Sequence, residues 1–300
     1  MHRKEEIVQK DKTGKILEDY NDVFADIYNV LVFGEKYLDE DGLETGPTES
    51  VYKAESGKLK EQRRDVLKTY RKQNFAICSL GIENQSTIDK YMPLRVMGYD
   101  YATYRNQINN KKKFLPTITI ILNFSDKEWN EPKSLHELFY IPDKLKAFVP
   151  DYQINIYDIA FLEDEVIEKF TSDFRLVAKY LKMRRLGKVD VLTNDRQEIK
   201  HVEEVLDLFR VFTKDERYEE LLTEEIKGMV EKGEKVNMCI VLDTIEQRGI
   251  ECGIQMGITQ GISQGRLELM KKWVEKGRMT IEEAAEEMEV TVAEMKDMFV

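Results

Sequence analysis

Two acidic side chains and one amide occupy positions that a β-hairpin would bring together. Asp65 and Glu83 are symmetric about position 74, and Gln73-Asn74 is a pair of residues that favours a turn. In a regular hairpin the two carboxylates would face each other with their Cβ atoms about 5 Å apart, where they repel unless a cation lies between them. Gln85 would project from the same face as Glu83, because strand side chains alternate. This spacing therefore indicates a divalent-metal site.

A solvated pair of acids is the simpler interpretation of the same residues, since carboxylates are not rare at strand ends. The setting of Glu83 favours the metal site. It follows the apolar run from Phe75 to Ile82, which is typical of a buried central strand. A carboxylate at the end of such a strand needs a partner that offsets its lost hydration.

The hairpin and the segment before it are rich in basic residues. The basic residues between positions 58 and 72 are Lys58, Lys60, Arg63, Arg64, Lys68, Arg71 and Lys72. Seven basic residues less two acidic ones, Glu61 and Asp65, give a local charge of +5 in a chain whose formal net charge is −11. A basic surface beside paired acids suits a polyanionic substrate. Lysines that protect an edge strand from aggregation are the alternative.

The elements around the hairpin follow from apolar spacing. A helix is predicted over 19–33; it carries Asp22 and Asp26 on one face and ends at Gly34. Further predicted elements are a strand over 48–53, a helix over 91–109 with Arg95 and Arg105, strands over 116–124 and 152–159, and a helix over 164–186. This order of helices and strands predicts a mixed α/β fold. We expect a structural role for His136, since no second His or Cys lies at ligand spacing.

The last third of the chain is helical by pattern, with amphipathic helices predicted over 201–212 and 216–233. Glycine then recurs every four residues from Gly249 to Gly265, and an isoleucine follows each of the first four. Glycine costs a helix roughly 1 kcal/mol per position relative to alanine. Close approach of a second helix in an oligomer would offset that cost, whereas a flexible linker is the other interpretation.

Residues 267–300 predict a helix-turn-helix arrangement with threonine caps at Thr280 and Thr291. The segment is strongly acidic, and it lacks the basic or amide side chains with which a helix reads DNA. We therefore interpret it as a protein-interaction or oligomerisation element.

Composition restricts the class of protein. No run of apolar residues is long enough to span a membrane, and the first residues lack the apolar core of a signal peptide. The three unclustered cysteines, Cys78, Cys239 and Cys252, argue against a disulfide framework and against a structural zinc site. We expect a cytoplasmic protein without a membrane partner.

Several of these segments together resemble a known family. They are Phe24-Ala25-Asp26, Arg64-Asp65-Val66-Leu67, Gly81-Ile82-Glu83-Asn84-Gln85, Met92-Pro93-Leu94-Arg95 and the Gly-Ile tail. Their order and spacing are similar to those of the recombination-promoting nuclease (Rpn)/transposase family, within the PD-(D/E)XK nuclease superfamily. The resemblance covers about residues 10 to 260.

The resemblance implies a restriction-endonuclease-like α/β core, with a mixed sheet flanked by helices, that cuts DNA with Mg²⁺ or Mn²⁺. It implies that Asp65 and Glu83 are catalytic metal ligands and that an acid of the first helix, best matched by Asp26, completes the site. Gln85 takes the position of the superfamily lysine. A neutral amide orients groups only by hydrogen bonds, so either the activity would be weaker or the missing charge would come from Lys68 or Arg95.

We therefore predict a nuclease-like domain over 1–190, a helical extension over 196–248, the Gly-Ile repeat over 249–266 and the acidic tail over 267–300. The predicted function is a metal-dependent DNA endonuclease linked to recombination or transposition, which forms a homo-oligomer through its all-helical C-terminal region. The alternative is a catalytically inactive scaffold or interaction protein that retains the nuclease fold.

Overall fold

The computed structural model describes residues 15–46, 49–53, 59–73, 75–188, 195–213, 215, 217–218 and 225–299. The chain divides into two compact units, Met1–Val241 and Leu242–Val300. The first part of the helix predicted over 216–233 falls largely outside the described ranges.

The first unit is built on a five-stranded mixed sheet in the order β1-β4-β5-β6-β7. Its strands are β1 (Leu43–Thr45), β4 (Val66–Lys72), β5 (Phe75–Gln85), β6 (Thr117–Asn123) and β7 (Asn155–Asp158). β1, β4 and β5 are antiparallel neighbours, whereas β5, β6 and β7 run parallel. A separate antiparallel pair is formed by β2 (Glu49–Lys53) and β3 (Leu59–Arg63). The mixed sheet confirms the predicted α/β class.

The predicted hairpin is the pair β4 and β5. Val66 pairs with Ile82, and the register shifts after Tyr70, so that a β-bulge takes up one extra residue before the turn. Gln73 has a left-handed backbone (φ 49°), as a tight turn requires; its predicted partner Asn74 lies outside the described residues. β5 is the central strand, and its second half is buried. Continued one step beyond the Val66 pair, the register sets Asp65 opposite Glu83.

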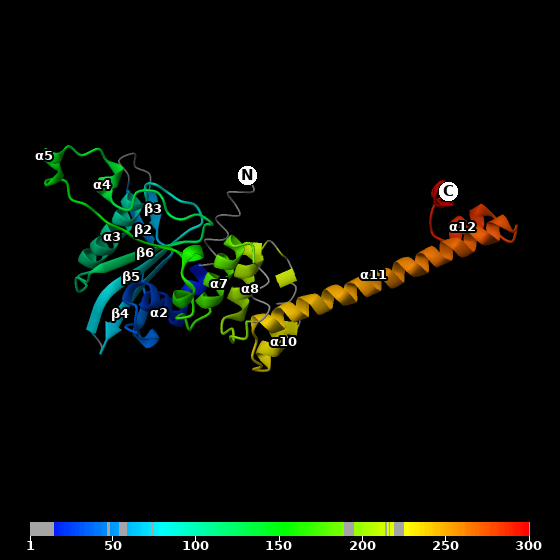
Figure 1. The fold of residues 1–300 in the computed structure, drawn as a ribbon, viewed down its shortest axis with the longest axis horizontal. Coiled ribbons are helices and arrows are strands. Elements are labelled where there is room, and N and C mark those ends of the chain that lie inside the picture. The colour runs from blue at the N-terminus through cyan, green and yellow to red at the C-terminus, as the bar shows by residue number, and fades with distance from the viewer. Residues whose placement is uncertain are drawn as a thin grey trace. The chain divides into compact units, whose positions relative to one another are not determined.

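Helices cover both faces of the sheet (Figure 1). α3 (Met92–Asn109) lies against one face, from which it reaches the end of β5. α2 (Asn21–Tyr28) covers the other face, where the Tyr28 hydroxyl donates to the carbonyls of Gly81 and Ile118. α2 continues as the π-helical turn η1 (Asn29–Phe33) and ends at Gly34 (φ 70°), as predicted. The remaining elements of this unit are η2 (Glu40–Gly42), α4 (Leu135–Leu138), α5 (Asp143–Lys146), η3 (Ile159–Phe161), α6 (Asp164–Ile167), α7 (Phe174–Arg185), α8 (Val202–Thr213) and α10 (Glu225–Glu231).

The single helix predicted over 164–186 is wrong. The structure has two helices there, α6 and α7, separated by residues 168–173. In this link the backbone N–H groups of Thr171 and Ser172 donate to the carboxylate of Asp26 rather than to carbonyls of a preceding helical turn. A buried carboxylate that accepts two amides ends the helical ladder locally. His136 contacts the Val149 carbonyl and Asp151, which agrees with a structural role.

The second unit contains most of α11 (Met238–Glu275), followed by α12 (Ile281–Glu287) and α13 (Val292–Met298). The Gly-Ile repeat is helical throughout, so the linker interpretation is wrong. Thr280 and Thr291 each form a capping box, which confirms both predicted caps. A small core packs the end of α11 against the two short helices; it contains Met270, Ala284, Ala285 and Met295. No helix in the described part of the chain combines the length and the apolar character that crossing a membrane requires.

Candidate functional site

Asp65 and Glu83 meet where β4 begins and β5 ends. The Asp65 Oδ2 atom accepts a hydrogen bond of 2.8 Å from the backbone N–H of Asn84, the residue next to Glu83. Asp65 is half-buried, whereas Glu83 is only 3% exposed. The hairpin register therefore brings together the two carboxylates that the sequence predicted as metal ligands.

The two oxygens of Glu83 have different surroundings. Oε1 accepts hydrogen bonds from Arg95 Nη2 at 2.6 Å, from the Tyr99 hydroxyl at 3.2 Å and from Gln85 Nε2 at 3.2 Å. Oε2 is buried and has no hydrogen-bond partner among the described residues. A buried carboxylate oxygen left without a partner is costly. Coordination of a cation would give this oxygen a partner.

Burial and mutual repulsion act against both charges. Burial, with the nearby Asp65 charge, raises the pKa of Glu83 to about 8, although Arg95 opposes the shift. Burial also raises the pKa of Asp65, and the hydrogen bond from the Asn84 N–H only partly offsets it. A divalent ion between two such groups would stabilise both ionised forms.

Arg95 is the cation that contacts Glu83. It lies in the first turn of α3, after Pro93. Besides Glu83, its guanidinium reaches Asp89 Oδ2 at 3.1 Å and Gln85 Oε1 at 3.4 Å through Nη1. Burial lowers the pKa of Arg95, but the Glu83 charge, together with Tyr99 and the hydrogen bond to Asp89, more than offsets this and the net shift is upward. Arg95 therefore remains charged.

Gln85 is fixed in place rather than open to solvent. Its Nε2 donates to the Asn84 carbonyl at 2.7 Å as well as to Glu83, and its Oε1 faces Arg95. The amide thus bridges the acid and the cation of the site.

A further buried acid lies on the opposite face of β5. Asn84 points away from Glu83, because neighbouring strand residues alternate, and its Nδ2 donates to Glu18 Oε2 at 2.7 Å. Glu18 is 1% exposed and belongs to the short helical turn over residues 15–18. Glu18 could not be predicted from the sequence, because one turn is too short to show helical periodicity.

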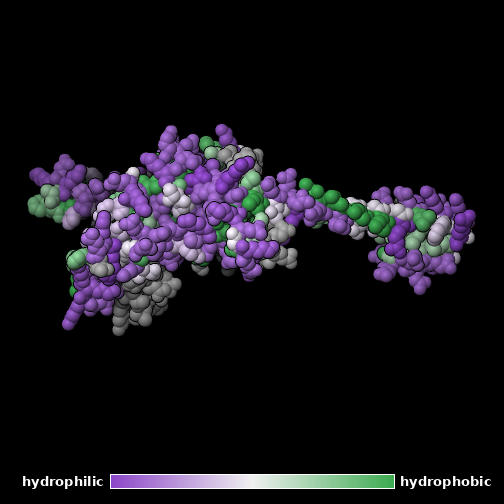
Figure 2. Space-filling view, turned by 90° about the horizontal axis from the view of Figure 1, so that it is seen from below, coloured by the Kyte–Doolittle hydropathy of each residue, from purple (hydrophilic) through white to green (hydrophobic). Residues whose placement is uncertain are grey.

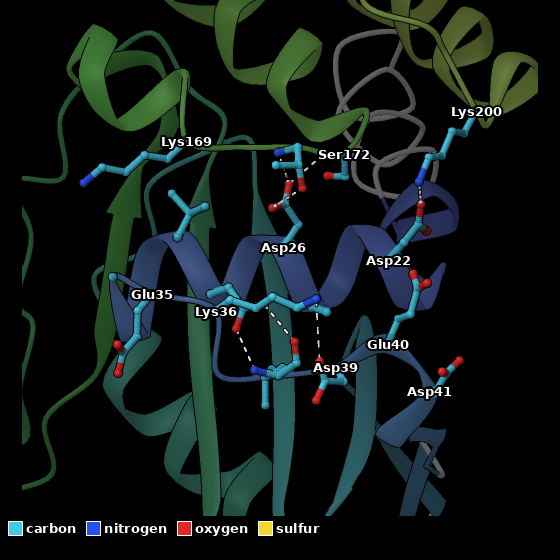
Figure 3. A pocket seen from close by; sticks show the side chains of 16 residues that line it. Asp22, Asp26, Glu35, Lys36, Asp39, Glu40, Asp41, Lys169, Ser172 and Lys200 are labelled. Atoms are coloured by element: carbon cyan, nitrogen blue, oxygen red, sulfur yellow. Dashed lines mark hydrogen bonds and ion pairs between the residues drawn. The ribbon is translucent and has the colours of Figure 1, made fainter.

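Asp26 is directed elsewhere. Its carboxylate accepts from the Thr171 N–H at 2.9 Å, the Thr171 hydroxyl at 3.1 Å and the Ser172 N–H at 2.8 Å (Figure 3). Within the described ranges no hydrogen bond joins it to Asp65, Glu83 or Gln85. The structure thus brings three of the four predicted catalytic residues together, and Asp26 is the exception.

Asp26 lines a pocket of about 560 Å³ that is mainly acidic. Its charged lining consists of Asp22, Asp26, Glu35, Asp39, Glu40 and Asp41 with Lys36, Lys169 and Lys200. Neither Asp65 nor Glu83 lines it. An excess of carboxylates repels phosphate, so this pocket does not suit a nucleic-acid backbone.

The basic surface predicted for the hairpin is not formed by Arg64 or Lys68. Arg64 is 3% exposed and donates to Asp100 at 2.5 Å, and Lys68 is 1% exposed and donates to the carbonyl and carboxylate of Asp19. Lys68 lies in the buried first half of β4, an inner strand, and both Arg64 and Lys68 are paired internally. The side chains of Lys58, Lys60 and Arg63 lie outside the described part of the structure.

Arg64 belongs to a polar network beneath the site that the sequence did not reveal. Its partner Asp100 also accepts from the Thr119 hydroxyl at 2.6 Å and from the Tyr152 hydroxyl. Gly81 leaves room for the guanidinium, because a Cβ there would lie 2.5 Å from Arg64 Nη1. The one available signal was a glycine inside an apolar strand, which often marks a close approach.

The residues where β4 begins and β5 ends provide two carboxylates for the implied Mg²⁺. No cluster of three or more His, Cys, Asp or Glu side chains that could hold a metal occurs in the described residues. Mg²⁺, however, keeps several waters and commonly binds proteins through one or two carboxylates plus substrate phosphate. The Asp65–Glu83 pair, with the unpartnered Glu83 Oε2, fits that mode of binding.

Comparison with known proteins places the chain in a family. A family profile described as "Putative transposase, YhgA-like" matches residues 52–216, more than half of the 300 residues. The matched region contains Asp65, Glu83, Gln85 and Arg95. No curated protein and no solved structure matches the chain. The motifs, the mixed sheet and this match agree, and the chain belongs to the YhgA-like transposase family.

Proposed function

We propose that this chain is a metal-dependent DNA endonuclease that hydrolyses phosphodiester bonds in recombination or transposition. One observation carries the proposal: the Asp65–Asn84 contact holds Asp65 beside Glu83, whose Oε2 is buried without a hydrogen-bond partner in the described structure. Membership of a family described as transposases supports DNA as the substrate.

In this proposal Asp65 and Glu83 hold Mg²⁺ or Mn²⁺. A bound ion of this kind neutralises charge on the phosphate and lowers the pKa of bound water. Gln85 keeps Glu83 in position and presents its amide beside the carboxylate. Tyr99, whose hydroxyl donates to the same oxygen, fixes the rotamer of Glu83 from α3.

The second part of the proposal concerns assembly as a homo-oligomer through the C-terminal helices. Ile250, Ile254, Ile258 and Ile262 are each more than half exposed, and nothing lies within 4 Å of a Cβ built on the neighbouring glycines. Figure 2 shows a run of hydrophobic side chains along the middle of α11. Residues 252–265 carry no charge. A second copy would meet no like-charge repulsion there, and its isoleucines could pack into the row of glycines.

The nuclease proposal is tested by incubating purified full-length protein with supercoiled plasmid and Mg²⁺ or Mn²⁺. We expect nicking or linearisation that EDTA abolishes and that Asp65→Asn and Glu83→Gln each reduce at least about 100-fold. Asp39→Asn is the matched control, because it removes a carboxylate from the acidic pocket that Asp26 lines and leaves Asp65 and Glu83 unchanged. Equal cutting by Asp65→Asn and wild type would refute the proposal.

An inactive scaffold is the second candidate. The ion pair between Arg95 and Glu83 favours it, because this contact already neutralises the Glu83 carboxylate without a metal. Metal binding separates the two. A nuclease site predicts that Mn²⁺ raises the melting temperature of the wild type but not that of Glu83→Ala, whereas a scaffold predicts no shift in either.

A further inference from the structure

We propose that Arg95 changes partner during the reaction: it neutralises Glu83 in the metal-free protein and contacts the DNA phosphate once a divalent cation has bound. The inference rests on the nuclease function proposed above. It identifies the group that supplies the positive charge that Gln85 lacks.

The contacts of Arg95 support the first half of this exchange. Its guanidinium bonds Glu83 Oε1 at 2.6 Å and also reaches the Gln85 amide oxygen at 3.4 Å. The cation therefore lies beside both of the β5 residues that face α3 at the site. Only one Glu83 oxygen is used, so Oε2 would be left for a metal while Arg95 is still in contact.

Two other cations beside the hairpin, Lys68 and Arg64, cannot make the exchange. Lys68 is held by Asp19 and Arg64 by Asp100, and both are almost completely buried. The Arg95 side chain, in contrast, is 38% exposed. Of these three cations, Arg95 is therefore the one that substrate phosphate can reach.

The structure also provides the position to which Arg95 would move. A divalent ion on Glu83 would repel the guanidinium that shares that carboxylate. Asp89 already accepts from Arg95 Nη1 at 3.1 Å and is 32% exposed. The guanidinium can release Glu83, remain on Asp89 and turn its other N–H groups toward a phosphate, which guanidinium binds through two parallel hydrogen bonds.

If Arg95 changes partner in this way, its removal should change the metal affinity and the cleavage rate in opposite directions. Removal of Arg95 removes a competitor for Glu83, so the metal affinity without DNA should rise. Removal of the phosphate contact should slow cleavage. A residue that only supports the local structure would lower the metal affinity and the cleavage rate together.

The test uses the full chain, stripped of metal with a chelator. Mn²⁺ binding is measured by titration calorimetry without DNA, and cleavage is measured in single turnovers at saturating Mn²⁺. For Arg95→Met we expect Mn²⁺ affinity to rise about 10-fold, the scale of changes next to metal ligands, and the cleavage rate to fall on the order of 100-fold. Tyr99→Phe is the matched control, because it removes another donor to Glu83 Oε1 and keeps the cation; we expect no gain in its Mn²⁺ affinity.

Asp89→Asn provides a second test that leaves Arg95 in place. Without the alternative acceptor Arg95 should stay on Glu83, so Mn²⁺ affinity should fall several-fold. Unchanged or weaker Mn²⁺ binding by Arg95→Met would overturn the competition, and an unchanged cleavage rate would overturn the phosphate contact. If the wild type binds Mn²⁺ but cuts no DNA, the nuclease function fails, while tighter binding by Arg95→Met would still support the partner exchange at Glu83.

Discussion

At the scale of single residues, the site depends on a carboxylate whose surroundings oppose its charge. Glu83 lies in the sheet core beside Asp65, and Arg95 offsets only part of the cost of ionising it. The pair was predictable from the sequence, because the two acids are evenly spaced about a turn and Glu83 follows an apolar run typical of a buried strand, where carboxylates are rare. The sequence could not predict that Arg64 and Lys68 point inward, because their partners Asp100 and Asp19 lie 36 and 49 residues away in the chain.

The raised pKa of Glu83 predicts how stability depends on pH. Its folded value of about 8 lies above its ordinary value of 4.5. Between these values the folded protein holds a proton that the unfolded chain has released, so the free energy of unfolding falls as pH rises from about 4.5 to 8. Glu83→Gln cannot ionise. We expect its advantage over metal-free wild type to grow by at least about 2 kcal/mol between pH 5 and pH 9.

Urea denaturation in EDTA at pH 5, 7 and 9 measures this difference. The control is Glu44→Gln, which alters an exposed acid on β1. A gap between Glu83→Gln and wild type that stays constant with pH would contradict the raised pKa.

At the scale of elements, the β4–β5 hairpin positions the site, and one glycine determines how closely it packs. The hairpin was predictable because strand alternation and turn residues are local signals. A Cβ at Gly81 would lie 2.5 Å from Arg64 Nη1 and 2.7 Å from its Cδ. Arg64 is enclosed and bonded to Asp100, so it has little room to move aside.

We therefore expect Gly81→Ala to lower the free energy of unfolding by about 1–3 kcal/mol, as overpacking does. Gly228→Ala is the matched control in α10, where nothing lies within 4 Å of the added Cβ; it should raise stability by up to about 1 kcal/mol. Chemical denaturation compares the two variants. If Gly81→Ala were as stable as wild type, the Arg64 side chain would have to move away from the added Cβ without cost, and the predicted overpacking would be wrong.

The break between α6 and α7 shows where sequence patterns fail. It depends on Asp26 and Thr171, which are 145 residues apart, so no local window contains both. We expect Asp26→Ala to lower the free energy of unfolding by about 1–3 kcal/mol, because it leaves buried N–H groups unpaired. Mn²⁺ affinity should stay unchanged in calorimetry, since Asp26 does not contact Asp65 or Glu83. A large loss of Mn²⁺ affinity in Asp26→Ala would instead indicate that Asp26 takes part in metal binding.

At the scale of the whole molecule, a transposase-family unit is followed by a helical unit that exposes a row of glycine and isoleucine. The helical form of the repeat was predictable from its period of four. The surface that packs against the repeat was not predictable, because the repeat marks one face of the helix but carries no information about what that face contacts.

Gly257→Ala distinguishes an exposed helix from a packed one. On an isolated helix the change should stabilise, since alanine is the better helix former. In an assembly in which another helix packs against the glycine row, we expect it to weaken self-association about 10-fold or more, as measured by sedimentation equilibrium. Thr259→Ala, on the opposite side of α11, is the control. If both variants associate as wild type does, the glycine row is not the contact.

The central claim is that Asp65 and Glu83 share a divalent cation. Anomalous scattering from crystals soaked in Mn²⁺ tests it most directly. We expect an anomalous peak within about 3 Å of an Asp65 carboxylate oxygen and of Glu83 Oε2. The same peak should be absent from crystals of Asp65→Asn. A peak in the acidic pocket beside Asp22 and Asp26, with none at the end of β5, would contradict the account.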